Sequence, residues 1–311
     1  MGTPEFALPS FEATRARTEL VLVVTQPDRP AGRGRKPKAP AVKLAAAEAG
    51  IEVVQPERSV TRELGARLDE LAPDVIVVAA FGKILGQRIL DLPRLGCVNV
   101  HASLLPRHRG ASPVLWAVRS GDAETGVTIQ RMVYEMDAGS VLGQRRTRID
   151  PDETAGELTA RLSSLGAEAL VDVLAALEQG TAHGTPQDPA LVTLAPTMRK
   201  EDGLVDWALP AKQVHDHVRA MNPWPMAFTT CAEGRLAIVR TRLVASEGRL
   251  GSPGEVVRAD RKGISVACGE GAIEVLEAQR EGKKVCCAPD LVSGRAVGLC
   301  EVFGACTEPE P

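Results

Sequence analysis

An amide side chain and an imidazole side chain lie two residues apart in the stretch formed by residues 97–113. The stretch begins with valines around Asn99 and continues into Leu-Leu-Pro and Arg-Gly, which is typical of a strand that passes into a loop. Because alternate residues of a strand point to the same face, Asn99 and His101 should lie side by side. The carboxyl ends of strands line the ligand crevice of an open parallel sheet. The stretch is therefore predicted to form the centre of an active site.

The chemistry that such a pair could perform is acyl transfer. The amide of Asn99 can donate a hydrogen bond to a carbonyl oxygen that becomes an oxyanion, an effect worth about 3–4 kcal/mol. A neutral His101 can accept the proton of an attacking amine and accelerate the reaction roughly 10²–10⁴-fold. From spacing alone, a hydrogen-bonded pair that only completes the strand end is an equally good interpretation. A carboxylate would have to orient the imidazole, and spacing does not choose among Asp122, Asp137 and Asp150.

A basic segment at residues 26–40 is the second candidate for function. Its positive residues, set among prolines and glycines, are Arg29, Arg33, Arg35, Lys36 and Lys38. This composition predicts a loop without regular structure, and most charge runs of this kind are simply solvated. At the carboxyl end of a parallel strand, however, the segment would lie on the active-site side and would suit a polyanion such as RNA. His108, between two arginines, is expected on a solvated surface.

Strands and helices that could position these residues alternate through the first half of the chain. Strands are expected at residues 19–25, 51–54, 74–80, 97–101, 128–133 and 140–149, and helices at residues 41–50, 61–71, 84–90, 113–120 and 153–178. The alternation predicts an α/β domain with a doubly wound, mostly parallel sheet. A further helix is expected at residues 214–221. Short strands separated by Gly and Pro follow it, which indicates a small β-barrel or sandwich.

The domain boundaries follow from a change in composition. Residues 1–180 are predicted to form the catalytic domain, residues 181–200 a linker rich in Thr, Pro and Gly, and residues 201–311 the second domain. The tail from residue 300 onwards is expected to fray. A length of 311 residues is compatible with two domains.

Composition excludes several classes of protein. The chain is 44% apolar with a net charge of −3, it has no apolar run long enough to span a membrane, and no secretory signal is visible. Its seven cysteines form no C-x-x-C pair, which argues against a zinc site or a disulfide framework. G-x-G-x-x-G and G-x-S-x-G are both absent, which argues against a dinucleotide-dependent dehydrogenase and an α/β-hydrolase. We therefore expect a cytoplasmic protein with no membrane contact.

Seven motifs resemble those of the methionyl-tRNA formyltransferase family over nearly the whole chain. They are G-T-P-E-F-A at residues 2–7, T-Q-P-D-R-P-A-G-R-G at 25–34, N-V-H-A-S-L-L-P-R-H-R-G-A at 99–111, E-T-G-V-T-I at 124–129, M-D-A-G at 136–139, K-E-D-G at 200–203 and N-P-W-P at 222–225. The third motif, with a downstream Asp, is similar to that of folate-dependent formyltransferases generally. The basic segment and N-P-W-P resemble those of the tRNA-specific enzymes.

The resemblance implies a reaction and its catalytic residues. The formyl donor would be 10-formyltetrahydrofolate, and the acceptor would be the α-amino group of methionyl initiator tRNA. Asn99 would donate to the oxyanion, His101 would accept the proton, and Asp137 would orient the imidazole. Neither a metal nor a covalent enzyme intermediate would be required. The enzyme would act in translation initiation and is expected to be a monomer.

The resemblance also implies binding residues and the fold of the second domain. The folate would contact Phe81, Gly82, Lys83, Ile84, Leu85, Ser103, Leu104, Leu105 and Pro106. The basic segment would insert at the acceptor end of the tRNA, where Arg33 is the residue expected to matter most. The second domain would be an OB-like barrel that holds the tRNA backbone.

One feature departs from the family pattern. Family members usually carry a short strand before M-G-T-P-E-F, and the printed sequence begins inside that motif. A central strand would then be lacking, and its neighbours would keep unpaired backbone groups that each cost on the order of 1–3 kcal/mol when buried. The missing strand leaves open a tRNA- or folate-binding protein without turnover. A separate alternative is a formyltransferase for a small amine such as a nucleotide or sugar. The basic segment and the second domain argue against the small amine.

Overall fold

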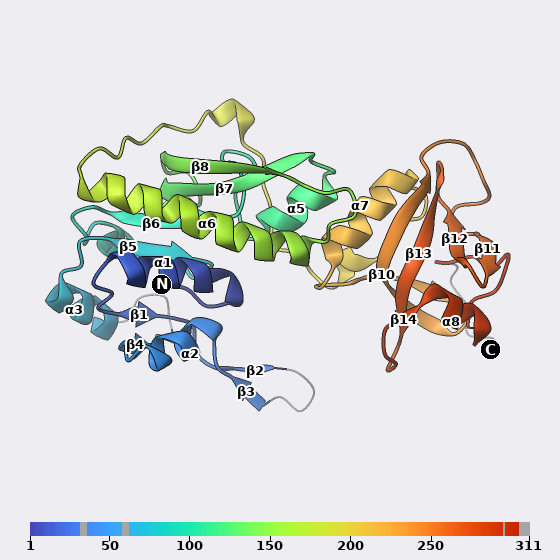
Figure 1. Cartoon of the computed structure of the whole chain (residues 1–311), viewed down its shortest axis with the longest axis horizontal. Coiled ribbons are helices and arrows are strands. Elements are labelled where there is room, and N and C mark those ends of the chain that lie inside the picture. Colours follow the sequence, from blue (N-terminus) through green and yellow to red (C-terminus); the bar gives the residue numbers. More distant parts are fainter. Residues whose placement is uncertain (32–35, 58–61, 295, 305–311) are drawn as a thin grey trace. The chain divides into compact units, whose positions relative to one another are not determined.

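The computed structural model of the chain describes residues 1–31, 36–57, 62–294 and 296–304. The chain folds into two compact units. Unit 1 comprises Met1–Pro113, Glu124–Arg148 and Thr159–Pro196, and unit 2 comprises Val114–Ala123, Ile149–Leu158 and Thr197–Pro311. Helices and strands alternate in unit 1, whereas strands dominate unit 2 (Figure 1). The predicted α/β domain followed by a β-rich domain is confirmed.

Unit 1 contains two short parallel ladders and an antiparallel extension. Its strands are β1 (Val23–Val24), β4 (Val53–Val54), β5 (Ile76–Ala79), β6 (Cys97–His101), β7 (Glu124–Arg131) and β8 (Val141–Arg148). β1 pairs in parallel with β4, and β5 pairs in parallel with β6. β7 and β8 continue the second ladder in the antiparallel direction. The β-branched residues of β5 and β6 are almost all buried, as expected for strands that are covered on both faces.

The helices of unit 1 cover these ladders. They are α1 (Leu8–Arg17), preceded by a 3₁₀ turn at Glu5–Ala7, then α2 (Ala41–Glu48), α3 (Arg62–Leu71), α4 (Gln87–Leu90) and most of α6 (Ala155–Glu178). The long α6 lies along the sheet (Figure 1), and Gly166 brings it close to the side chain of Val100 on β6. Arg145 of β8 forms ion pairs with Glu168 and Asp172 of the same helix. The strand that bears the site residues is therefore packed against α6.

The apolar residues at 19–25 form less strand than their sequence predicts. Among these residues Val23 and Val24 pair with Val53 and Val54 of β4, and the carbonyl of Val24 also accepts a hydrogen bond from the N–H of Gly2. The other side of β1 borders a cavity of about 640 Å³ that separates β1 from β5.

The basic segment folds into a hairpin, and the predicted absence of regular structure is wrong. β2 (Arg29–Ala31) and β3 (Lys36–Lys38) pair antiparallel, with Arg29 opposite Lys38 and Pro30 opposite Pro37. Proline is tolerated here because both strands are edge strands and need no inner hydrogen bond at that position. Arg33 and Arg35 lie outside the described residues, whereas Arg29 and Lys38 are exposed.

Unit 2 is built on one antiparallel sheet. Its strands are β9 (Ala227–Cys231), β10 (Gly234–Ala245), β11 (Val256–Asp260), β12 (Gly263–Ala267), β13 (Ala272–Arg280) and β14 (Cys286–Cys287), and its helices are α5 (Pro113–Arg119), α7 (Ala211–Met221) and α8 (Ala288–Ser293). The order in the sheet is β11-β12-β13-β10-β9, with β14 beside β13. Its core gathers buried side chains of the sheet with those of α7 and α8.

Residues 300–304 make backbone hydrogen bonds to the sheet, contrary to the expectation of a frayed tail, and residues 305–311 of the predicted tail lie outside the described residues. Val256 of β11 donates a hydrogen bond to the carbonyl of Glu301, and Gly304 donates one to Thr230 of β9. Phe303 is buried against Trp207, with ring centroids 5.8 Å apart. The segment thus connects the two edge strands of the sheet, as the closing segment of a small barrel would. Within the described ranges, no helix is long and apolar enough to cross a bilayer.

Candidate active site

Strand β6 carries Asn99 and His101 to its carboxyl end. β6 is held on one side by β5, where Val78 faces Asn99, and on the other by β7, where Thr128 faces His101. His101 is buried and Asn99 is half-buried. In the described part of the chain, the amide of Asn99 has no hydrogen-bond partner, so its NH₂ group is available to a ligand. The predicted pair on one face of a strand is therefore present.

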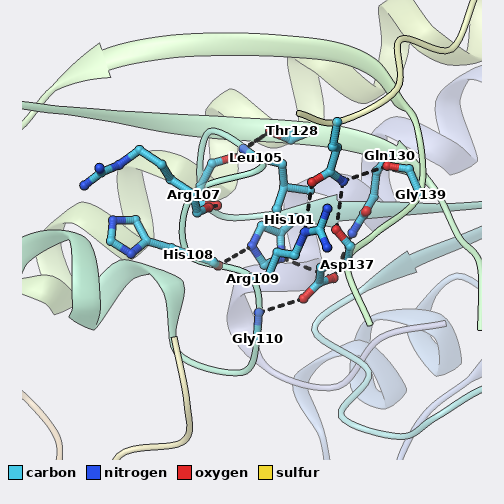
Figure 2. A network of polar contacts seen from close by, with 12 residues as sticks. His101, Leu105, Arg107, His108, Arg109, Gly110, Thr128, Gln130, Asp137 and Gly139 are labelled. Atoms are coloured by element: carbon cyan, nitrogen blue, oxygen red, sulfur yellow. Dashed lines mark hydrogen bonds and ion pairs between the residues drawn. The ribbon is translucent and has the colours of Figure 1, made fainter. Parts of the chain in front are cut away.

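The imidazole of His101 is fixed by a backbone carbonyl. Its Nε2 lies 2.9 Å from the carbonyl oxygen of His108 (Figure 2). A carbonyl can only accept a hydrogen bond, so Nε2 must carry a proton. His108 has a positive φ of 59° and its side chain is 5% exposed, so the expectation of a solvated His108 is wrong. The side chain of His108 is therefore buried, although the charged residues Arg107 and Arg109 flank it in the sequence.

The second ring nitrogen of His101 faces a carboxylate. Nδ1 lies 3.6 Å from Oδ1 of Asp137, which is beyond hydrogen-bond distance but well within the range of charge interaction. Burial lowers the pKa of His101 below its usual value, and the negative charge of Asp137 partly opposes this effect. A neutral imidazole with its proton on Nε2 has a free lone pair on Nδ1. Nδ1 is therefore the atom that can accept a proton, and the charge of Asp137 would stabilise the resulting imidazolium.

Asp137 is held by donors from three parts of unit 1. Its Oδ2 accepts a hydrogen bond from the backbone N–H of Gly110 at 2.9 Å, and its Oδ1 accepts one from Nε2 of Gln130 at 2.8 Å (Figure 2). Gln187 donates to the carbonyls of Asp137 and Gly139. These contacts hold the residue at a positive φ of 52°. Of the three carboxylates that sequence spacing allowed, the structure brings Asp137 to His101, while Asp122 and Asp150 belong to unit 2.

Gln130 and Gln187 were not predicted from the sequence. A buried amide on a strand is a detectable signal, because Gln130 follows Val127 and Ile129 in a run that is otherwise apolar or small. Gln187 lies in the segment predicted to be a linker, and nothing in its sequence neighbourhood marks it. Its contact with Asp137 spans fifty residues of chain.

The residues expected at the folate divide into buried and accessible groups. Phe81 and Leu85 belong to the apolar core, whereas Ile84 is 64% exposed and Gly82 is exposed with a positive φ. The ammonium of Lys83 donates hydrogen bonds to two carbonyls, those of Pro56 and Glu57. Gly82 and Ile84 are therefore the exposed residues of this loop, and Lys83 is half-buried.

Hydrogen bonds to the rest of unit 1 stabilise the turn formed by residues 103–106. Ser103 is buried and donates to the carbonyl of Arg107, while Thr128 joins the carbonyl of Ser103 to the N–H of Leu105. Leu104 and Pro106 are half-buried. The turn can therefore present backbone groups and partly exposed apolar side chains to a ligand. Its polar side chain, that of Ser103, already donates a hydrogen bond within the protein.

The arrangement as a whole suits transfer of an acyl group to an amine. An unpaired amide could donate to the oxygen of a carbonyl under attack. A neutral, buried imidazole beside a fixed carboxylate could take the proton that the amine loses. Neither function needs a nucleophilic side chain.

Two family models match the chain. The model described as formyl transferase matches residues 2–174, and the model described as formyl transferase, C-terminal domain, matches residues 197–296. Together they cover most of both units.

Curated relatives resemble the chain over nearly its full length. A protein named methionyl-tRNA formyltransferase from Sorangium cellulosum (strain So ce56) is 46% identical over 305 residues, covering 97% of this chain and 98% of its own. The protein of the same name from Geotalea uraniireducens (strain Rf4) is also 46% identical, covering 98% of this chain and 96% of its own.

Solved structures share the fold. The N-formyltransferase from Helicobacter canadensis, solved with folinic acid and dTDP-3-aminofucose, gives a TM-score of 0.67 at 16% identity and covers 88% of this chain and 96% of its own. HypX from Aquifex aeolicus, solved with tetrahydrofolic acid, gives a TM-score of 0.61 at 20% identity and covers 90% of this chain and 48% of its own.

Proposed function

The chain belongs to the formyl transferase family, and we propose that it transfers a formyl group from 10-formyltetrahydrofolate to the α-amino group of methionyl initiator tRNA. It is thus an enzyme of one-carbon transfer that serves translation initiation. The proposal is supported by full-length relatives that bear the name methionyl-tRNA formyltransferase. We propose that it acts in the cytoplasm, where initiator tRNA is charged, and that it acts as a monomer.

The observation that carries the mechanism is the free Nδ1 of His101 beside Asp137. Since Nε2 is occupied by the carbonyl of His108, only Nδ1 can take the proton that the attacking amine releases. The fixed charge of Asp137 favours the imidazolium that forms. The carboxylate thus contributes through its charge, whereas the carbonyl of His108 sets the orientation of the ring.

Asn99 supports the other half of the reaction. When the amine attacks the formyl carbon, the carbonyl oxygen becomes negative, and the half-buried amide of Asn99 would donate a hydrogen bond to it. When the tetrahedral species collapses, the bond to the folate nitrogen breaks, and the proton held on His101 can pass to that nitrogen. The carbonyl is restored and His101 returns to its neutral form.

The base need not be strong. An α-amino group has a pKa of about 8, and esterification of the methionine to the tRNA should lower it further, so that little base strength is needed near neutral pH. Positioning of the two substrates and stabilisation of the oxyanion should therefore supply most of the acceleration.

The folate is assigned to the two loops that flank the catalytic strand. Residues 81–85 would contact the pterin through the backbone at Gly82 and the side chain of Ile84, and the turn at residues 103–106 would contact it through the backbone and the half-buried Leu104 and Pro106. The names of two structures with the same fold, which include tetrahydrofolic and folinic acid, support a folate at this kind of site.

The tRNA is assigned to the basic hairpin and unit 2. Arg29 and Lys38 are exposed at the base of the hairpin, and Arg33, Arg35 and Lys36 complete its positive charge. Lysine and arginine that neutralise phosphates give affinity that falls steeply with salt. The hairpin would contact the acceptor end, and the sheet of unit 2 would contact the tRNA backbone.

A comparison of acceptors tests the proposal. With 10-formyltetrahydrofolate as donor, formylation of methionyl initiator tRNA should exceed formylation of free methionine and of amino sugar nucleotides by orders of magnitude. Activity confined to the small amines would replace the tRNA by a small acceptor. Salt-dependent tRNA binding without formylation would show a binding protein.

A further inference from the structure

Residues 185–195 are bound to unit 1 at both ends, and we call this segment the linker strap. It is almost the last part of unit 1, because the chain enters unit 2 at Thr197. Thr185, at its first end, exchanges two backbone hydrogen bonds of 2.9 Å with Val141 at the start of β8. Ala195, at its other end, is fully buried. The linker strap is therefore a structured part of unit 1.

The second half of the linker strap pairs with the turn that orients His101. The N–H of Arg109 donates to the carbonyl of Thr193 at 2.9 Å, and the N–H of Ala195 donates to the carbonyl of Arg109 at 2.7 Å. The N–H of His108 donates to Oγ1 of Thr193 at 2.8 Å. The carbonyl of His108 is the group that accepts a hydrogen bond from Nε2 of His101. The linker strap therefore holds the residue that orients the imidazole.

The close approach of the turn to the linker strap depends on Gly110. This residue has a φ of 126°, and a Cβ atom at its position would lie 2.6 Å from the carbonyl oxygen of Ala195. The N–H of Gly110 donates to Oδ2 of Asp137 at 2.9 Å. A side chain at residue 110 would therefore push apart the turn and the linker strap at the point where the turn also contacts Asp137.

The side chain of Gln187 links the same turn to the loop that carries Asp137. Its Oε1 accepts a hydrogen bond from Nε of Arg109 at 3.0 Å. Its Nε2 donates to the carbonyls of Asp137 and Gly139, at 2.8 and 2.7 Å. The turn contacts Nε2 of His101, and the loop faces Nδ1. One side chain of the linker strap therefore fixes the distance between the two segments that surround the imidazole.

The linker strap also holds two residues of the site that have a left-handed backbone. His108 has a φ of 59° and Asp137 a φ of 52°. Such values are uncommon for residues other than glycine, and they persist where surrounding contacts hold them. Thr193 supplies such a contact at the N–H of His108, and Gln187 supplies one at the carbonyl of Asp137. The contacts of the linker strap thus lie where the backbone would otherwise relax.

We propose that the linker strap is a positioning element of the formyl transfer, in which Gln187 sets the place of Asp137 and Thr193 sets the place of the His108 carbonyl. Both residues act on His101 through these groups. The role rests on the proposed function, because it takes His101 as the proton acceptor. The segment that leads into unit 2 is thus part of the structure that fixes the proton acceptor.

A segment that only supports the fold would behave differently from a positioning element. Its loss would lower the stability, but the folded protein would keep its chemistry. Burial lowers the pKa of His101, the charge of Asp137 raises it, and the charge of His108 lowers it. Displacement of Asp137 would therefore lower the pKa of His101 further. The proton affinity of His101 distinguishes the two roles.

The first experiment replaces Gln187 by Met, which has a similar length and no amide. We expect kcat to fall roughly 10- to 100-fold with little change in KM for tRNA or folate, since a displacement of about 1 Å can cost this much. The titration midpoint of His101, followed by NMR of its ring nitrogens, should move to lower pH. Gln179→Met, at an exposed position just after α6, is the matched control.

A double-mutant cycle determines whether Gln187 acts through Asp137. Asp137→Asn removes the charge whose distance Gln187 is proposed to set. Gln187→Met should therefore shift the midpoint of His101 in the wild-type background and leave it in place in the Asp137→Asn background. Equal shifts in both backgrounds would overturn the role given to Gln187.

Thr193 provides an independent pair of variants. Thr193→Val keeps the shape and removes the acceptor for the N–H of His108, so kcat should fall roughly 3- to 10-fold. Thr193→Ser keeps the acceptor and should retain the wild-type kcat. Because Thr193 is exposed, neither substitution opens a cavity in the core, and both proteins should fold. Equal kcat in the two variants would overturn the role given to Thr193.

The titration of His101 needs no turnover, so it separates this proposal from the proposed reaction. If the wild-type protein formylates only small amines, the acceptor is wrong, and the titration still decides on the linker strap. A midpoint moved to lower pH by Gln187→Met supports a positioning role. A lower Tm with an unchanged midpoint and an unchanged kcat of the folded protein would show that the linker strap serves only the fold, and would overturn the proposal.

Discussion

Gln130 and His101 both lie next to the same carboxylate oxygen, Oδ1 of Asp137. Nε2 of Gln130 donates a hydrogen bond of 2.8 Å to Oδ1 of Asp137, and the same oxygen lies 3.6 Å from Nδ1 of His101. Gln130 is 2% exposed, and its Oε1 has no hydrogen-bond partner among the described residues. The amide thus directs its donor at Asp137 and fixes the distance at which the charge of the carboxylate acts on the imidazole.

Replacement of Gln130 by Met should therefore slow the reaction without weakening either substrate. Met has a similar length and no donor, so Asp137 would lose a charge-assisted hydrogen bond worth about 1.5–3 kcal/mol. We expect kcat to fall by roughly 10- to 100-fold with little change in KM for tRNA or folate. Gln213→Met, on the exposed face of α7, is the matched control. An unchanged kcat in Gln130→Met would show that Asp137 is held without this amide.

Replacement of His101 by Ala should lower turnover at least 100-fold, because it removes the proton acceptor. Single-turnover formylation of methionyl initiator tRNA is the measurement. His183→Ala, in an exposed position, should keep full activity. Near-wild-type turnover in His101→Ala, with the Tm preserved, would refute the assignment of His101.

Replacement of Asn99 by Ala should also lower turnover at least 100-fold, because about 3–4 kcal/mol of oxyanion stabilisation is lost. Asn99→Asp keeps the size but offers a carboxylate instead of a donor, and it should be at least as slow. Binding of folate, followed by fluorescence, should change little in either variant. If Asn99→Asp retained wild-type turnover, a donor at this position would not be needed.

The pH profile should report the neutral imidazole. Burial holds the pKa of His101 below its usual 6.5, so the acid limb of kcat/KM should have its midpoint below pH 6.5. The charge of Asp137 raises this pKa, so Asp137→Asn should lower both the turnover and the midpoint of the limb. A limb that stays in place or moves to higher pH in Asp137→Asn would contradict the charge interaction.

Replacement of Arg33 or Lys38 by Ala should weaken the use of tRNA and leave the folate unaffected. Removing one cation that neutralises a phosphate should raise KM for tRNA and reduce the slope of log affinity against log salt by about 1. Arg15→Ala, an exposed arginine of α1 that pairs with Glu12, serves as the control. An effect confined to folate binding would contradict the role given to the hairpin.

Local periodicity was sufficient to predict much of the fold. The alternation of apolar strands and helices predicts the order of elements in unit 1 from residue 19 onwards, although helix α1 was not predicted. A spacing of two residues predicts that Asn99 and His101 share a face. Both follow from backbone geometry within a few residues. The prediction of a loop at the basic segment was wrong, because it rested on charge and proline content. These properties do not determine whether two short edge strands pair.

The choice of carboxylate and of proton-accepting atom depended on tertiary structure. Spacing left three aspartates open, and Asp137 meets His101 because Gly110 and Gln130 hold it there. The free nitrogen is Nδ1 because a turn with a positive φ presents the carbonyl of His108 to Nε2. The sequence by itself determined which side chains share the catalytic strand. Only the tertiary structure decided which atom of His101 is free, because that depends on hydrogen-bond partners from other segments of the folded chain.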